Sequence, residues 1–204
     1  MGNIDLKSVS AKYMDILKEI GNIGAGNATT ALASMLQCRI DMNVPEVKLI
    51  EVDELAESLG GAQRVMTAIF LEVEGDITGN IIFLLEQGSA KFLVSKLMGM
   101  EVSDDFGEME LSCIKEISNI IAGSYLNSLS TLTNLKIYPS VPHLQMDMVE
   151  TILHTPAKEN TKANDQILFI QTEFKDDIQL GGYFVMIPDT ESYGKILGAL
   201  GIIL

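Results

Sequence analysis

The sequence has no tryptophan, few aromatic residues, and only two cysteines and two histidines. Cys38 and Cys113 lie far apart, without the close spacing of metal-binding cysteines, so we expect two reduced structural thiols. His143 and His154 are too few and too scattered to suggest a zinc site. These shortages argue against a zinc enzyme, and we expect the chain to hold no metal of its own.

Basic residues are also scarce, because 14 lysines and arginines face 28 aspartates and glutamates, which gives a net charge of −14. Like-charge repulsion makes nucleic acid a poor partner for such a chain. Apolar runs are short: Ile81–Leu85 has the length of a strand, whereas a membrane span needs roughly 20 residues. The first residues, MGNIDLKSVS, lack the apolar core of a signal peptide. We therefore expect a cytoplasmic protein without membrane insertion.

The chain repeats itself at an offset of 97 positions, which superimposes residues 15–45 on residues 112–142. The later parts of the two halves match more faintly. Apolar residues make up 47% of the chain, which is enough for a real core. The residues that recur in the better-matched segment are Lys18, Glu19, Ile20, Asn22, Ile23, Ala25, Gly26, Leu32, Ile40, Val44 and Pro45, which return as Lys115, Glu116, Ile117, Asn119, Ile120, Ala122, Gly123, Leu129, Ile137, Val141 and Pro142.

Hydrophobic periodicity and turn residues predict the same order of elements in each half. We expect one domain over 1–204, built of two repeats at about 9–100 and 108–202. The fold class is α+β with pseudo-twofold internal duplication: one antiparallel sheet is shared by both halves, with the two long repeated helices packed on it. The expected helices cover 9–36, 53–59, 88–99, 108–132, 144–154 and 189–199; the expected strands or extended segments cover 39–50, 64–74, 78–85, 135–142, 166–175 and 179–187.

Two polar pairs, Glu19 with Asn22 and Glu116 with Asn119, are spaced i, i+3 on the repeated helices. That spacing makes the two side chains neighbours on one helix face. A polar stripe on an amphipathic helix is the simplest interpretation. However, asparagine is poorly suited to a helix interior, because its side chain competes for backbone hydrogen bonds. Its recurrence in both copies, where neighbouring positions have changed, favours a functional role.

The two copies follow the pattern (Asp/Ser)-x3-Glu-x2-Asn-x22-Pro, which resembles the motif of the CheC/CheX/FliY phosphatase family. The first copy is Asp15, Glu19, Asn22 and Pro45, and the second is Ser112, Glu116, Asn119 and Pro142. The resemblance extends over essentially the whole chain. Two motif copies and no added switch domain resemble the free-standing CheC branch best, because CheX-like members carry one copy and dimerise.

The resemblance implies a phosphatase that hydrolyses the aspartyl phosphate of the chemotaxis response regulator CheY-P. Asn22 and Asn119 would position the attacking water, while Glu19 and Glu116 would dock the regulator's active-site Lys. The Mg²⁺ would be carried by the response regulator. Phosphoryl transfer depends mainly on positioning and charge neutralisation, so such a site needs no nucleophile of its own. Asp15 and Ser112 would support each Glu, and the two prolines would shape the segment after each helix.

Three glycines, Gly21, Gly24 and Gly26, form the stretch GNIGAG within the first predicted helix. They do not have the GxGxxG spacing or the preceding strand of a dinucleotide-binding loop. We interpret them as positions where the two repeated helices pack closely, which would offset the cost of glycine in a helix, about 1 kcal/mol each.

The Met-rich stretch Leu144–Val149 reads as part of an amphipathic helix, with Leu144, Met148 and Ile152 on one side. Core packing is the simplest account. The family resemblance adds binding of the receptor deamidase CheD in this part of the chain, with Leu144, Asp147 and Met148 as the docking residues. The expected partners are therefore CheY-P and CheD, with the chain a monomer or a heterodimer with CheD.

A second interpretation is a non-catalytic adaptor of the chemotaxis or flagellar-switch system, similar to the middle domain of FliM. A protein of that class should lack the Glu/Asn pairs, which this chain has twice. A metal- or nucleotide-dependent enzyme is a third class, and the sequence offers no ligand set for it.

Overall fold

The computed structural model describes residues 11–39, 41–51, 54–103, 105–153, 166–175 and 179–201. The elements follow one another in the order predicted from the sequence, with one exception discussed below. They are α1 (Ala11–Leu36), β1 (Asp41–Glu51), α2 (Leu55–Ser58), β2 (Val65–Gly75), β3 (Gly79–Glu86), α3 (Gln87–Met98), α4 (Glu108–Thr133), β4 (Ile137–Pro139), β5 (His143–Met148), α5 (Val149–Leu153), β6 (Gln166–Lys175), β7 (Gln179–Pro188) and α6 (Thr190–Ala199).

The strands form one seven-stranded antiparallel sheet in the order β1-β6-β7-β3-β2-β4, in which β5 also pairs with β2. The hairpins β2–β3 and β6–β7 meet where β3 pairs with β7, and there Phe83 lies opposite Phe184. The outermost strands are exchanged between the halves, since β1 pairs with β6 whereas β4 and β5 pair with β2. The predicted fold class, with a single sheet shared by both halves, is confirmed.

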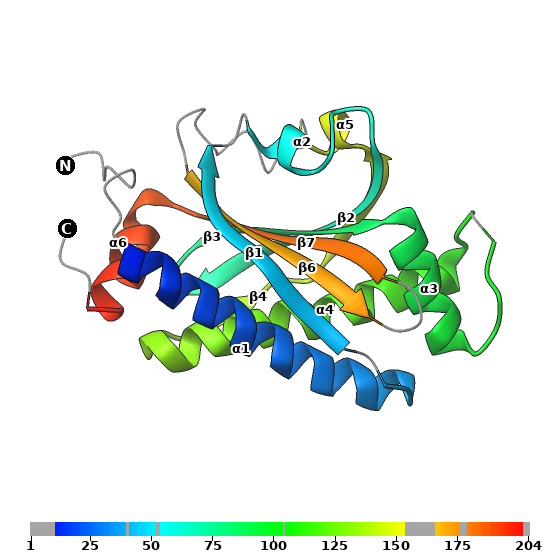
Figure 1. The fold of residues 1–204 in the computed structure, drawn as a ribbon, viewed down its shortest axis with the longest axis horizontal. Helices are drawn as coiled ribbons and strands as arrows, with labels where there is room; N and C mark the ends of the chain where they lie inside the picture. The colour runs from blue at the N-terminus through cyan, green and yellow to red at the C-terminus, as the bar shows by residue number, and fades with distance from the viewer. Residues whose placement is uncertain are drawn as a thin grey trace.

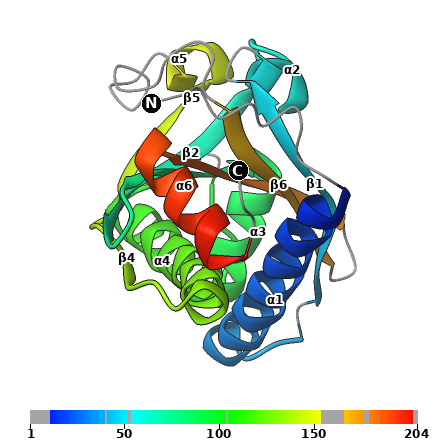
Figure 2. The same ribbon diagram turned by 90° about the vertical axis from the view of Figure 1, so that its left-hand side faces the viewer.

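Helices cover both faces of this sheet, which makes three layers. The long helices α1 and α4 lie side by side on one face and run in opposite directions (Figures 1 and 2). Helices α3 and α6 lie on the same face. The short helices α2 and α5 lie on the opposite face (Figure 2). Each face has its own hydrophobic core cluster. The predicted packing of both repeated helices on the sheet is therefore confirmed.

The strands supply both cores because successive side chains of a strand point to opposite faces. On β2, Ile69 and Leu71 point into the core beneath α1 and α4, while Met66 and Ala68 point into the core beneath α2 and α5. A strand buried on both faces reads as a continuous apolar run. This explains why Ile81–Leu85 showed no alternation in the sequence.

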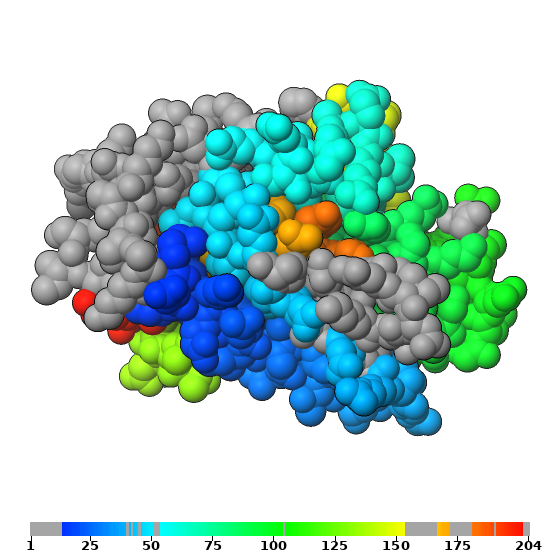
Figure 3. Space-filling model, viewed as in Figure 1, coloured from blue at the N-terminus to red at the C-terminus, as the bar shows by residue number. Residues whose placement is uncertain are grey.

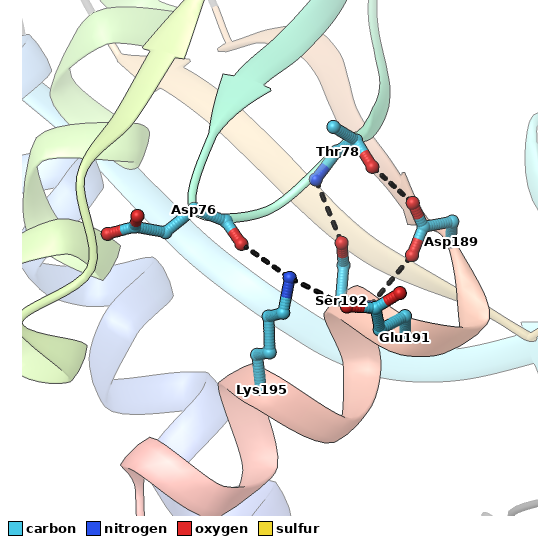
Figure 4. A network of polar contacts seen from close by, with 6 residues as sticks. All are labelled: Asp76, Thr78, Asp189, Glu191, Ser192 and Lys195. Carbon is cyan, nitrogen blue, oxygen red and sulfur yellow. Dashed lines mark hydrogen bonds and ion pairs between the residues drawn. The ribbon is translucent and has the colours of Figure 1, made fainter.

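The end of the sheet nearest α6 is fastened by a polar network around the N-terminus of that helix (Figure 4). Asp189 is the N-cap residue, and its carboxylate accepts a hydrogen bond from the backbone N–H of Ser192 at 2.8 Å and another from the hydroxyl of Thr78. The backbone N–H of Thr78 donates in turn to the hydroxyl of Ser192 at 2.8 Å. The network joins α6 to the turn between β2 and β3, so a helix of the second half is tied to a hairpin of the first.

The predicted helix over 144–154 is wrong. Residues His143–Met148 form the edge strand β5, antiparallel to β2, and only Val149–Leu153 are helical. Leu, Gln and Met have high helix propensity, and tertiary pairing with β2 overrides it here. His154 and the polar stretch 157–165 lie outside the described residues.

Within the described part of the chain, no helix combines the length and the apolar character that crossing a membrane requires.

Candidate functional site

The first copy of the motif lies on the solvent-facing side of α1. Asp15, Glu19 and Asn22 are exposed, whereas Leu17 and Ile20 between them are buried in the core. The helical repeat produces this division, since residues four and seven positions apart return to the same face. Figure 3 shows the surface of α1 exposed on this side of the molecule. The structure therefore brings the first Glu/Asn pair to the surface.

The second copy occupies the matching side of α4. Ser112 and Glu116 are exposed and Asn119 is half-buried, while Ile114 and Ile117 are fully buried. The hydroxyl of Ser112 donates a hydrogen bond within its own helix, to the carbonyl oxygen of Glu108 at 2.9 Å. The two copies thus differ at the position before the Glu: α1 presents a carboxylate there, and α4 presents a hydroxyl whose proton is already used.

The contact between α1 and α4 sets the relative position of the two pairs. Gly24 leaves room for the ring of Tyr125, since a Cβ on Gly24 would lie 2.5 Å from its Cδ1 atom. The side-chain amide of Asn27 also donates to the hydroxyl of Ser128 at 3.3 Å. Each Glu/Asn pair precedes this contact on its own helix, and the helices run in opposite directions. The two pairs therefore lie on opposite sides of the crossing, about 20 Å apart along the helix axes at 1.5 Å per residue.

The chemistry available at each pair is that of a free carboxylate beside a free amide. Within the described ranges, the side chains of Glu19, Asn22, Glu116 and Asn119 form no hydrogen bond or ion pair. An amide both donates and accepts, so it can hold a water in a fixed orientation, and a carboxylate can bind an ammonium group. Among the residues that the structure describes, no cluster of three His, Cys, Asp or Glu side chains could hold a metal ion.

Cys113 lies on α4 beside the second pair and is a free thiol, as is Cys38. Burial, and secondly the negative charge of Glu110, raise the pKa of the Cys113 thiol. Since only the thiolate is strongly nucleophilic, Cys113 stays unreactive at neutral pH. The prediction of two unpaired cysteines is confirmed.

Pro45 and Pro142 fall at corresponding interruptions of the sheet. The pairing of β1 with β6 shifts register between Asn43 and Glu46, and the second copy breaks between β4 and β5, which end at Pro139 and begin at His143. Proline has no N–H to donate to a ladder, and such bulges accommodate it. That the prolines shape the segment after each helix stays a prediction.

The residues predicted to dock a partner on a helix lie on β5 instead. Leu144 is partly buried and packs on the core beneath α1 and α4. Asp147 pairs with Met66 of β2, and its carboxylate accepts a hydrogen bond from the N–H of Met148 at 2.7 Å. Because side chains alternate along a strand, Asp147 points to the opposite face from Leu144 and Met148. The three residues therefore do not share one face.

Comparisons with known proteins agree on one family. The model of the CheC-like family matches residues 14–49 and 109–145. The protein CheY-P phosphatase CheC of Bacillus subtilis is 38% identical over 200 residues, which cover 95% of this chain and 96% of that protein. This chain belongs to the CheC-like family.

Both segments matched by the CheC-like family model carry a complete motif. Residues 14–49 contain most of α1 and of β1, and residues 109–145 contain all but the first residue of α4, with β4 and the start of β5. Among solved structures, Thermotoga maritima FliY has a TM-score of 0.80 at 20% identity and covers 95% of this chain and 98% of its own. The FliM middle domain from H. pylori has a TM-score of 0.70 at 15% identity, over 94% of this chain and 99% of its own. At these identities, the two structures show that the fold is shared.

Proposed function

We propose that this chain is a phosphatase that hydrolyses the aspartyl phosphate of the response regulator CheY-P. The observation that carries the proposal is that both Glu/Asn pairs reach the surface on matching helix faces, with only Asn119 half-buried and with no partner for the four side chains among the described residues. The 38% identical relative is named CheY-P phosphatase CheC, which supports the same substrate here.

In the proposed reaction, the regulator docks on α1 or α4 and its active-site Lys binds to the carboxylate of Glu19 or Glu116. The amide of Asn22 or Asn119 then holds a water in line with the phosphorus atom. The water oxygen attacks phosphorus, the bond from phosphorus to the aspartyl oxygen breaks, and the protons of the water leave with inorganic phosphate. Fixing the water lowers the entropic part of the barrier. The Mg²⁺ that neutralises the phosphoryl oxygens belongs to the regulator in this proposal.

Phosphate release from phosphorylated CheY tests the proposal. Asn22→Ala and Asn119→Ala should each lower the rate partially, and the double variant should fall to the regulator's own rate of hydrolysis. Asn127→Ala is the matched control, because Asn127 is an exposed asparagine on α4, two turns beyond Asn119. Circular dichroism should show the same fold for all four. A double variant that is folded and as active as wild type would refute the assignment.

A folded chain that binds phosphorylated CheY without accelerating its hydrolysis would be an adaptor instead. This is the adaptor alternative raised by the sequence, and the FliM middle domain shares the fold.

We further propose that CheD binds near β5 and α5, with Asp147 in contact. Asp147 lies on the edge strand, where a charged side chain is accessible, and the face it shares with α2 and α5 is separate from α1 and α4. Asp147→Lys should weaken CheD binding in a titration and leave phosphate release unchanged. Equal affinity for CheD in the variant and the wild type would remove Asp147 from the interface.

A further inference from the structure

One glycine recurs in both long helices, four residues after the asparagine of each pair. Gly26 on α1 and Gly123 on α4 are separated by the same offset of 97 as the motif residues. Glycine is the least favourable residue after proline in a helix interior, because it loses the most backbone freedom and packs no side chain. Its retention in both copies therefore needs a compensating reason.

The fold itself does not supply that reason. Neither glycine has a positive φ, and a Cβ built on either one would meet no atom of the described residues within 4 Å. The other two glycines of the first helix behave differently, since a Cβ on Gly24 would strike Tyr125 at 2.5 Å and one on Gly21 would lie 3.3 Å from Val47.

The duplicated helix has kept only the glycine that the fold does not explain. Positions 21 and 24 correspond to Ser118 and Ile121 in α4, so both glycines with a packing role inside the molecule were replaced there. Other exposed helical glycines, such as Gly198 on α6, also have open space around them. Gly198 has no counterpart at the corresponding positions of α3. The sequence interpretation that all three glycines serve the packing of the two repeated helices therefore holds for Gly24 alone, because Gly21 faces the strands β1 and β6 and Gly26 has no neighbour among the described residues.

The recurring glycine lies in line with the Glu/Asn pair. At about 100° per residue, it is turned about 40° from the asparagine and about 20° from the glutamate. Gly26 is exposed and Gly123 is half-buried. Both helices therefore present the same sequence of features along one face: a carboxylate, an amide, and then bare backbone one turn further.

We propose that the docked response regulator lies directly over Gly26 or Gly123, so that the missing side chain is a steric requirement of the complex. This inference rests on the proposed function, and it names the regulator as the occupant because the bare backbone is continuous with the residues that would bind it. A Cβ at this point would hold the regulator away from the helix and move the water off its line to phosphorus. A misplacement of about 1 Å can cost about 10²-fold in rate.

The test compares stability, binding and turnover in Gly26→Ala, Gly123→Ala and the double variant, followed by the same positions changed to Gln. Alanine should raise the midpoint of thermal unfolding in each single variant, because it relieves the cost of glycine in open space. Phosphate release should nevertheless fall, at least tenfold in the double alanine variant and further with Gln, and the affinity for phosphorylated CheY should fall in parallel. Gly198→Ala is the matched control, with a similar gain in stability and unchanged activity.

The outcomes separate this inference from the proposed function. If the double alanine variant binds and hydrolyses within twofold of wild type while the double asparagine variant is inactive, the inference is overturned and the phosphatase stands. If alanine destabilises either helix, the glycines have a packing role and the inference is also overturned. If wild type binds the regulator without hydrolysing it, the proposed phosphatase function is refuted, and the inference is then tested by whether the glycine variants bind the regulator more weakly than wild type. If wild type does not bind at all, both are refuted.

Discussion

The same substitution should have opposite effects at two positions of α1 that are only two residues apart. In Gly24→Ala the new Cβ would lie 2.5 Å from Cδ1 and 2.9 Å from Cγ of Tyr125. That ring cannot easily move, because it is 2% exposed and stacks on Phe184 with ring centroids 4.4 Å apart. In Gly26→Ala the new Cβ meets nothing within 4 Å in the part of the chain that the structure describes.

The magnitudes follow from two opposing effects. Replacing a helical glycine by alanine stabilises by about 1 kcal/mol. Forcing a methyl group into a close-packed core costs about 1–3 kcal/mol. Gly26→Ala should therefore gain up to about 1 kcal/mol, and Gly24→Ala should lose up to about 2 kcal/mol once the helix effect is subtracted. For a chain of this size, each kcal/mol moves the unfolding midpoint by about 2–4 °C.

Urea denaturation followed by circular dichroism measures both free energies of unfolding, provided that the slope with urea is the same in wild type and variants. Gly24→Ala with Tyr125→Ala in one chain is the informative control, because removing the ring should cancel the clash. A Gly24→Ala variant that gains as much stability as Gly26→Ala would show that α1 and α4 are not packed through Gly24, and the placement of the two sites on opposite sides of that contact would lose its support.

Two further predictions concern single polar groups. Thr67 is fully buried on β2, and its hydroxyl has no hydrogen-bond partner within the described residues. Thr67→Val should therefore raise the free energy of unfolding in urea by about 1 kcal/mol, because it removes an unsatisfied buried group. A lower free energy of unfolding would mean that the hydroxyl does form a hydrogen bond. Partial desolvation favours a higher pKa for Asp189, but hydrogen bonds from Thr78 and Ser192 outweigh it and lower the pKa below 3.8. The stabilisation is then complete above that value and is lost as the pH falls through the lowered pKa. Asp189→Ala should cost about 1 kcal/mol at pH 7 as a lost helix cap, and its deficit should shrink in unfolding curves below about pH 4; a deficit independent of pH would contradict this account.

Most of the fold could be predicted because its elements are long and locally consistent. The helix expected over 88–99 ends as α3 at Met98, with Gly99 in the left-handed conformation that glycine favours at a helix end. The turn expected at Glu74-Gly75-Asp76 appears with Gly75 at φ +118°. In both cases the signal is glycine's own tolerance of a positive φ, although at Gly75 a Cβ would also strike the backbone of Lys136.

The error at residues 144–148 had a different origin. A spacing of four residues between Leu144, Met148 and Ile152 is compatible with a helix, and short apolar segments cannot be assigned by periodicity alone. The duplication held the missing information, because the offset of 97 superimposes His143–Met148 on Glu46–Glu51, which form the second part of β1. Applying the repeat to the secondary structure as well as to the motif would have predicted a strand.

The candidate site was predictable in its residues but not in its arrangement. The recurrence of Glu and Asn identified the two pairs, and helical spacing placed each on one face. The sequence could not say which glycines contact the neighbouring helix, since Gly24 and Gly26 differ only in what a Cβ would meet. It also could not show that Asn119 is half-buried while Asn22 is exposed, because exposure depends on neighbouring elements.

The exchange of outer strands means that neither site belongs to one half alone. α1 packs on β1, where Val47 lies against Gly21, and β1 is held in the sheet by β6 of the second half. In the same way α4 contacts β4 and β5, which pair with β2 of the first half. A half taken alone would leave its helix on an unpaired strand, so a lesion that unfolds either half should remove both sites together. A partial loss of activity on changing one asparagine, with the fold intact, can therefore be attributed to that asparagine's own site.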